Sequence, residues 1–235
     1  MSDAAIGIFD SGIGGLTVMR ALVAHLPNEE FIYLGDTARL PYGTKSGDTV
    51  TRYAVQAAAA LMKRKVKMLV VACNTASAVA LPALQEMFAP VPVVGVIVPG
   101  AEAAVTAAPE GPIAVIATEG TVKGGAYVRA IEDHGRSIPV IQQACSLFVS
   151  IAEEGLVEGD IAEAIARRYI EPLLAAVPKP KALVLGCTHF PALKNTIAKV
   201  AGPDIKLVDS AETTAKAVEK ILRAKNIQRA SGSKP

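Results

Sequence analysis

The chain has 235 residues, of which 51% are hydrophobic and 20% charged, and its 24 Lys and Arg against 22 Asp and Glu leave a formal net charge of +2. This composition excludes a disordered chain, which would be poorer in apolar residues and richer in net charge. Aromatic residues make up 4% of the chain and Trp is absent. Because nucleic-acid binding needs a basic surface and aromatic stacking partners, nucleic acid is not expected as a primary substrate.

The N-terminal sequence MSDAAIGIFD reaches an apolar run without the basic region that opens an export signal. Every apolar run is far shorter than the roughly 20 residues that cross a bilayer. Three cysteines are an odd, low count that favours reduced thiols over a disulfide framework. We therefore expect a soluble, cytoplasmic protein that does not bind a membrane.

Short apolar runs bounded by Gly, Pro, Asp or Asn predict eight strands. These runs lie at 6–9, 31–35, 67–72, 91–97, 113–117, 140–144, 182–186 and 205–209. Apolar residues recur at helical spacing over 16–26, 50–62 and 218–222. Asp160 and Glu163 are expected to cap a further helix, and Gly202 to end one that begins near Pro191. Alternating strands and helices are typical of parallel α/β sheets covered on both faces.

The two halves of the sequence also resemble each other, as VVACNT at 70–75 and VLGCTH at 184–189 illustrate. Strand ends pair as Asp10 with Thr118, Asp36 with Cys145, and Cys73 with Cys187. We expect two similar doubly wound parallel-sheet domains related by pseudo-symmetry, with the active site in the cleft between them. The alternative is the general likeness of any two α/β segments. The predicted boundaries are 1–97 with 208–225 for the first domain, 98–207 for the second, and 226–235 for a flexible tail.

Cys73 and Cys187 each follow a buried-type strand where the next helix should begin, which is where open α/β sheets bind ligands. A helix N-terminus is expected to lower a thiol pKa from about 8.5 toward neutrality. Two facing thiols could then act as base and acid on opposite faces of one carbon. The alternatives are inert buried thiols, a zinc site with His189, and a Cys–His hydrolase. Cys145 is interpreted as a core residue or as one that supports the site from behind the contacting residues.

Polar residues at other strand ends could complete such a site. The run FDSGIGG at 9–15 is a Gly-rich turn whose backbone N–H groups could hold an anion, either a carboxylate or a phosphate. Asp10 and Asp36 end adjacent predicted strands. Each could hold an ammonium group, tune a nearby thiol or cap a helix.

Five segments in order resemble glutamate racemases of the aspartate/glutamate racemase superfamily. They are FDSGIGGLTV (9–18), LGDTARLPYGTKS (34–46), VVACNTASA (70–78), CSLFVSIAEEG (145–155) and VLGCTHFP (184–191). The resemblance implies a cofactor-independent isomerase, without a metal, that interconverts L- and D-glutamate and supplies D-glutamate for peptidoglycan. It also implies a cytoplasmic homodimer.

By position, the resemblance makes Cys73 the thiol that takes the α-proton from D-glutamate and Cys187 the one that takes it from L-glutamate. It places Asp10 beside Cys73 and His189 beside Cys187. The residues that match the family's substrate-binding positions are Asp10, Ser11, Tyr42, Gly43, Asn74, Thr75, Thr121, Thr188 and His189.

Asp36 and Glu153 match two further acidic residues that matter in the family. The segment around Glu153 departs from the family pattern, with Ser146 and Ser150 in place of two prolines and Ala152 before the glutamate. Three other functions remain open from the residues: an aspartate racemase, a Cys–His amidase of the same architecture, and a non-catalytic module that binds an amino acid.

Overall fold

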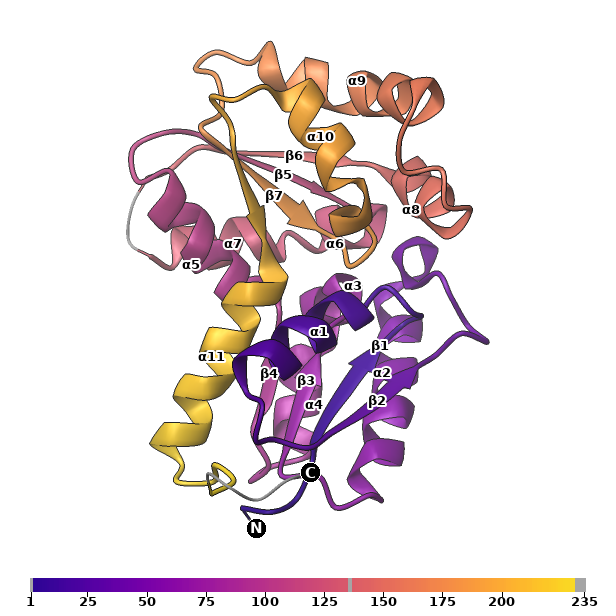
Figure 1. Cartoon of the computed structure of the whole chain (residues 1–235), viewed down its shortest axis with the longest axis vertical. Coiled ribbons are helices and arrows are strands. Elements are labelled where there is room, and N and C mark those ends of the chain that lie inside the picture. Colours follow the sequence, from indigo (N-terminus) through magenta and orange to yellow (C-terminus); the bar gives the residue numbers. More distant parts are fainter. Residues whose placement is uncertain (1, 135–136, 231–235) are drawn as a thin grey trace.

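The computed structural model describes residues 2–134 and 137–230. Two four-stranded sheets form its two domains, and all paired strands run parallel (Figure 1). Each of the eight predicted runs contains a strand, so the predicted α/β class is confirmed. No helix of the described residues is long and apolar enough to cross a membrane.

The first sheet has the order β2-β1-β3-β4 and carries helices on both faces. Ile6 and Ile8 pack with α1 and with α11 (Ser210–Ala224) on one face, whereas Phe9 packs with α2, α3 and α4 on the other. Successive strand residues point to opposite faces, so both faces need apolar side chains. The elements are β1 (Ile6–Asp10), α1 (Leu16–His25), β2 (Phe31–Gly35), η1 (Tyr42–Thr44), α2 (Gly47–Met62), β3 (Met68–Val71), α3 (Asn74–Val79), α4 (Leu81–Met87) and β4 (Val93–Gly95).

The second sheet repeats this order as β6-β5-β7-β8. Val115 packs with α5 and α7 on one face, and Ile116 packs with α8, α9 and α10 on the other. The elements are α5 (Ile97–Ala107), β5 (Ile113–Ala117), α6 (Glu119–Gly124), α7 (Ala126–Glu132), β6 (Val140–Ala144), α8 (Ser146–Glu153), α9 (Asp160–Leu174), β7 (Ala182–Gly186), η2 (Phe190–Leu193), α10 (Lys194–Ala201), β8 (Lys206–Asp209) and α11 (Ser210–Ala224). The shared strand order puts the predicted strand-end pairs at equivalent positions.

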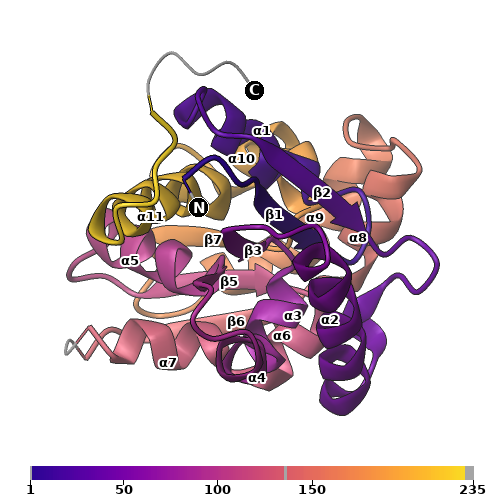
Figure 2. The same ribbon diagram turned by 90° about the horizontal axis from the view of Figure 1, so that it is seen from below.

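Helix α11 returns the chain from the second sheet to the first domain. It follows β8, an edge strand of the second sheet, and its Ala215, Val218 and Leu222 pack on the first sheet with α1. Figure 2 shows α11 beside both α1 and α5. The predicted domain boundary at residue 208, where the chain returns to the first domain, lies inside β8.

The segment after α11, which falls in the predicted flexible tail, contacts the first domain. The backbone N–H of Arg229 donates to Glu29 Oε1 at 2.9 Å, and its guanidinium donates to the carbonyl of Asp3 at 2.5 Å. Ile227 packs against the cluster of buried residues that β1, α1 and α11 share. These contacts place Ile227 and Arg229 against the first domain, and 231–235 lie outside the described residues.

One predicted helix cap is wrong. Asp160 is the first residue of α9 and makes no capping bond, because the cap position belongs to Gly159 at φ 88°. A positive φ favours glycine, which lacks the Cβ that makes this conformation costly. Gly202 does end α10, as predicted.

Candidate active site

Cys73 stands between β3 and α3 and is 4% exposed. Its thiol donates to Ser11 Oγ at 3.5 Å, and its sulfur accepts the backbone N–H of Ala76 at the same distance. The sulfur thus caps α3, as a polar side chain does at a helix N-terminus. Cys73 is positioned by two strand ends of one sheet, β3 for the thiol and β1 for its serine partner.

The predicted lowering of the Cys73 pKa is wrong. Burial, and next the charge of Asp10, raise the pKa of the Cys73 thiol to about 11. The Ser11 hydroxyl, which can rotate to donate to a thiolate, and the Ala76 N–H act in the opposite direction but are weaker. Desolvation therefore outweighs the helix N-terminus, because the hydration free energy that a thiolate loses on burial exceeds the stabilisation by one backbone N–H group.

Asp10 ends β1 and is fully buried. Its Oδ2 accepts the backbone N–H groups of Gly12 and Gly15 at 3.1 and 3.0 Å. A Cβ on Gly15 would come within 2.5 Å of the Asp10 Cβ, so the turn requires glycine there. Two of the amides expected to hold an external anion thus bind this carboxylate instead.

The second oxygen of Asp10, Oδ1, is buried without a hydrogen-bond partner among the described residues. Burial raises the pKa of this carboxyl, while the N–H groups of Gly15 and Gly12 and the charge of His189 act against that increase. A buried acceptor without a donor is costly, so Asp10 is suited to receive a cationic group.

Cys187 follows β7 and is 6% exposed. Its Sγ lies 3.7 Å from Nδ1 of His189, and the other ring nitrogen, Nε2, contacts the carboxylate of Glu153 at the end of α8. Burial raises the pKa of this thiol well above its usual range, and the charges of Cys73 and Asp10 add to the increase. The predicted neighbours Cys187 and His189 are therefore together, and the Glu153 carboxylate joins them despite the altered segment before it.

Asp36 follows β2, and its carboxylate is engaged away from the thiols. Tyr42 donates its hydroxyl to Asp36 Oδ2 at 2.5 Å, and the Arg39 guanidinium pairs with the same oxygen at 2.6 Å. Burial and the Asp36 carboxylate both raise the pKa of Tyr42. Asp36 therefore holds the η1 turn, which carries Tyr42 and Gly43, in place.

Three threonine hydroxyls form a triangle between the domains. Thr75 Oγ1 of α3 lies 2.9 Å from that of Thr118 and 3.3 Å from that of Thr121, and the last two are 3.0 Å apart. Thr118 caps α6 and is absent from the predicted site residues. The pairing of Asp10 with Thr118 in the repeat is the sequence signal that could have found it.

Close backbone approaches bring these groups together along one contact zone, which we call the seam. It comprises the end of β1 and the turn after it, η1, Cys73 and α3 of the first domain, against Thr118, α6, α7 and the β7–η2 turn of the second. A Cβ on Gly43 would lie 2.5 Å from the Thr118 Cβ, and one on Gly14 would lie 2.7 Å from Thr188 Oγ1. Every predicted site residue lies in the seam or, for Asp36 and Glu153, contacts a residue of it.

Asn74, the first residue of α3, is 3% exposed and reaches across the seam. Its Oδ1 accepts the hydroxyl of Tyr127 from α7 at 2.8 Å, whereas its Nδ2 has no partner within the described ranges. Tyr127 was missed by the sequence analysis, because no motif distinguishes it from other apolar residues of a helix.

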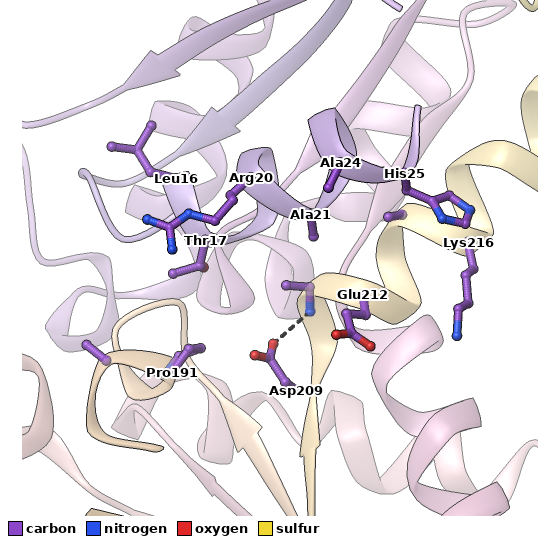
Figure 3. Close-up of a pocket in the computed structure, with 13 residues that line it drawn as sticks. Leu16, Thr17, Arg20, Ala21, Ala24, His25, Pro191, Asp209, Glu212 and Lys216 are labelled. Atoms are coloured by element: carbon purple, nitrogen blue, oxygen red, sulfur yellow. Dashed lines mark hydrogen bonds between the residues drawn. The ribbon is translucent and has the colours of Figure 1, made fainter. Parts of the chain in front are cut away.

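A separate cavity of about 700 Å³ lies on another side of the seam, between α1, the start of α11 and η2 (Figure 3). Its lining includes Arg20, Pro191 and Glu212 but no cysteine and none of the predicted site residues. For residues 2–134 and 137–230, no group of three His, Cys, Asp or Glu side chains could hold a metal ion. The zinc interpretation therefore has no ligand set in those ranges.

Known proteins provide an independent comparison. The sequence pattern of the family described as Asp/Glu/Hydantoin racemase matches residues 6–218. A glutamate racemase from Geobacter metallireducens is 52% identical over 225 residues, which cover 96% of this chain and 82% of the relative. The chain belongs to the glutamate racemase family. All five segments that carried the sequence resemblance lie inside the matched region.

Crystal structures of two glutamate racemases agree with this assignment. The Francisella tularensis enzyme, solved in complex with D-glutamate, has a TM-score of 0.92 at 39% identity, over 99% of this chain and 86% of that one. A glutamate racemase isoform from Bacillus anthracis has a TM-score of 0.95 at 36% identity, over 100% and 87%. The two-domain arrangement is thus that of the glutamate racemase family.

Proposed function

We propose that this protein interconverts L- and D-glutamate by a proton transfer between two thiols, with Cys73 and Cys187 as the catalytic pair. One observation carries the proposal: the two buried thiols follow equivalent strands, β3 and β7, and lie close enough that, in addition to burial, the charge of Cys73 raises the pKa of Cys187. Each has its own polar partners, Ser11 and Asp10 for Cys73 and His189 for Cys187.

In the proposed reaction, the Cys73 thiolate takes the α-proton from D-glutamate and becomes a thiol. Cys187 gives its own proton to the opposite face of the carbon and becomes a thiolate, which completes inversion without any change in oxidation state. L-glutamate reacts in the reverse order. The negative charge that develops at the α-carbon is stabilised by donors fixed in the desolvated seam.

The raised thiol pKa values fit this mechanism if binding supplies a positive charge. Asp10 is one cause of the raised Cys73 pKa. A substrate ammonium group beside Asp10 would offset that charge, because an opposite charge within a few ångströms favours ionisation of the thiol. Proton transfer would then become favourable only with substrate in place.

The polar groups of the seam suit the two carboxylates of glutamate. The hydroxyls of Thr75, Thr118 and Thr121 can rotate to donate to one carboxylate, and Asn74 Nδ2 adds a donor. The remaining predicted contacts are Ser11, Tyr42, Gly43, Thr188 and His189. Thr121 is proposed to bind the side-chain carboxylate.

The first experiment follows L-glutamate in heavy water by optical rotation and by deuterium at the α-carbon. Loss of rotation with deuterium uptake, absent in Cys73→Ala and Cys187→Ala, would support the proposal. Cys145→Ala is the matched control, because Cys145 is also buried and also follows a strand of the second sheet, and it should retain activity. Unchanged rotation without α-deuterium would refute the assignment.

One observation favours a second candidate, a Cys–His amidase. Cys187 contacts His189, and His189 contacts Glu153. This is the order of a nucleophile, its general base and a carboxylate that orients the base. Such an enzyme would depend on Cys187 and not on Cys73. Release of ammonia from glutamine by Cys73→Ala, without α-deuterium, would establish this alternative.

The proposal extends to biological role and organisation. D-glutamate made here would supply peptidoglycan synthesis, in the cytoplasm and in a homodimer, as the family assignment implies. We also propose that the domains divide near residues 97 and 208, which the helix packing of α5 and α11 supports. Sedimentation velocity with and without glutamate would test the dimer.

A further inference from the structure

Tyr127 is a fully buried residue of α7 that has no role in the proposed proton transfer. Its hydroxyl nevertheless donates across the seam to Oδ1 of Asn74, at 2.8 Å. Asn74 directly follows Cys73 in the chain. The bond therefore joins the helix that begins at the first thiol to an element of the second domain.

The direction of this hydrogen bond is fixed by its acceptor, because the Oδ1 atom of an amide carries no proton to donate. A phenol has a single proton, so Tyr127 gives its own to Asn74. Oδ1 of Asn74 is thus engaged, and the NH₂ end of the amide is the end left to bind substrate.

The tyrosine ring is held by two glycines of the second domain. A Cβ on Gly186, directly before Cys187, would lie 3.1 Å from Cε2 of Tyr127, and one on Gly100 would lie 3.3 Å from the hydroxyl oxygen. The ring therefore packs against backbone on both sides. Its position is tied to the turn that carries the second thiol.

We propose that Tyr127 is a positioning residue that orients the Asn74 amide, so that Nδ2 donates to a substrate carboxylate. Three observations carry this inference: the bond to Oδ1, the unpartnered Nδ2 within the described residues, and the ring held next to Cys187. The inference rests on the proposed function, because it assigns the carboxylate contact of that same site.

Removing the hydroxyl should free the amide to rotate, because the terminal torsion of asparagine is broad. In Tyr127→Phe we expect KM for glutamate to rise about tenfold, the scale of one well-placed hydrogen bond. The carboxylate is bound alike in the ground and transition states, so kcat should change by less than about threefold.

A double-mutant cycle with Asn74→Ala tests the connection. Adding Tyr127→Phe to Asn74→Ala should leave kcat/KM unchanged, because the amide that Tyr127 orients is gone. Tyr169→Phe is the matched control, since it removes a tyrosine hydroxyl that bonds to the Leu147 N–H of α8, and its KM should equal that of the unmodified protein. An equal loss from Tyr127→Phe in both backgrounds would overturn the inference.

Asn74→Asp provides a test that leaves Tyr127 intact. The new carboxylate can still accept the tyrosine hydroxyl, but it presents negative charge where Nδ2 stood. We expect KM to exceed that of Asn74→Ala; a lower KM would show that this position contacts the ammonium group and would refute the assignment. If the unmodified protein does not exchange the α-proton of glutamate, the proposed function itself fails.

Discussion

The raised pKa of Cys73 leads to a prediction about its reactivity in the protein without substrate. With a pKa of about 11, roughly one Cys73 in 10⁴ is ionised at pH 7, against roughly one in 10² for a thiol with the ordinary pKa of 9.0. Because the thiolate is the nucleophile, alkylation of Cys73 should rise about tenfold per pH unit from pH 7 to 10. An ordinary thiol would depart from this slope near pH 9 and approach its plateau near pH 10.

The assay is pulsed labelling with iodoacetamide over this pH range, followed by mass spectrometry of the Cys73 peptide. The same chain in denaturant is the reference, because there the thiol is fully hydrated. Limited access lowers all rates equally, so only the shape of the profile reports the pKa. Asp10→Asn should move the profile to lower pH, since it removes the charge that disfavours the thiolate. A profile that bends at or below pH 9 in the folded protein would refute the reasoning.

Three further predictions concern packing, a buried ion pair and pH. Gly43→Ala puts a Cβ 2.5 Å from the Cβ of Thr118. The seam must then widen by about 1 Å, so kcat/KM should fall about 100-fold. The control is Gly47→Ala, whose Cβ would lie 3.9 Å from its nearest neighbour, and it should keep full activity. Lys67→Met leaves the buried Glu29 carboxylate, now 2.6 Å from the Lys67 ammonium, without its charged partner and should cost about 3–5 kcal/mol in urea unfolding; a loss below about 1 kcal/mol contradicts this. The fold favours the neutral Cys73 thiol, so the contribution of this thiol to the unfolding free energy is present below pH 9 and is lost as pH rises toward 11. Over that range the loss amounts to about 1.4 kcal/mol per pH unit, and Cys73→Ala should remove it from the pH dependence of the unfolding free energy.

The strands were predictable because their composition reflects burial on both faces. The run at 113–117, for example, is entirely apolar and entirely buried. The internal repeat predicts that Cys73 and Cys187 lie at equivalent strand ends. Both features depend on residues close together in sequence, and a single chain can reveal them.

The electrostatics of the site could not be predicted in this way. The Cys73 pKa depends on how deeply the thiol is buried and on a carboxylate 63 positions earlier in the chain, at Asp10. Tyr127 and Thr118 become part of the seam only when the two domains meet. The Arg229 contacts join residues 200 positions apart. Such effects follow from tertiary distances that no local pattern encodes.

The placement of α11 has a consequence for any attempt to produce one half of the molecule alone. Because α11 covers a face of the first sheet after the chain has completed the second, the second unit is nested within the first. A fragment ending before Ser210 would expose the apolar face that Val218 and Leu222 cover and should aggregate. An isolated first half would instead require excision of the inner segment and a short splice from β4 to α11.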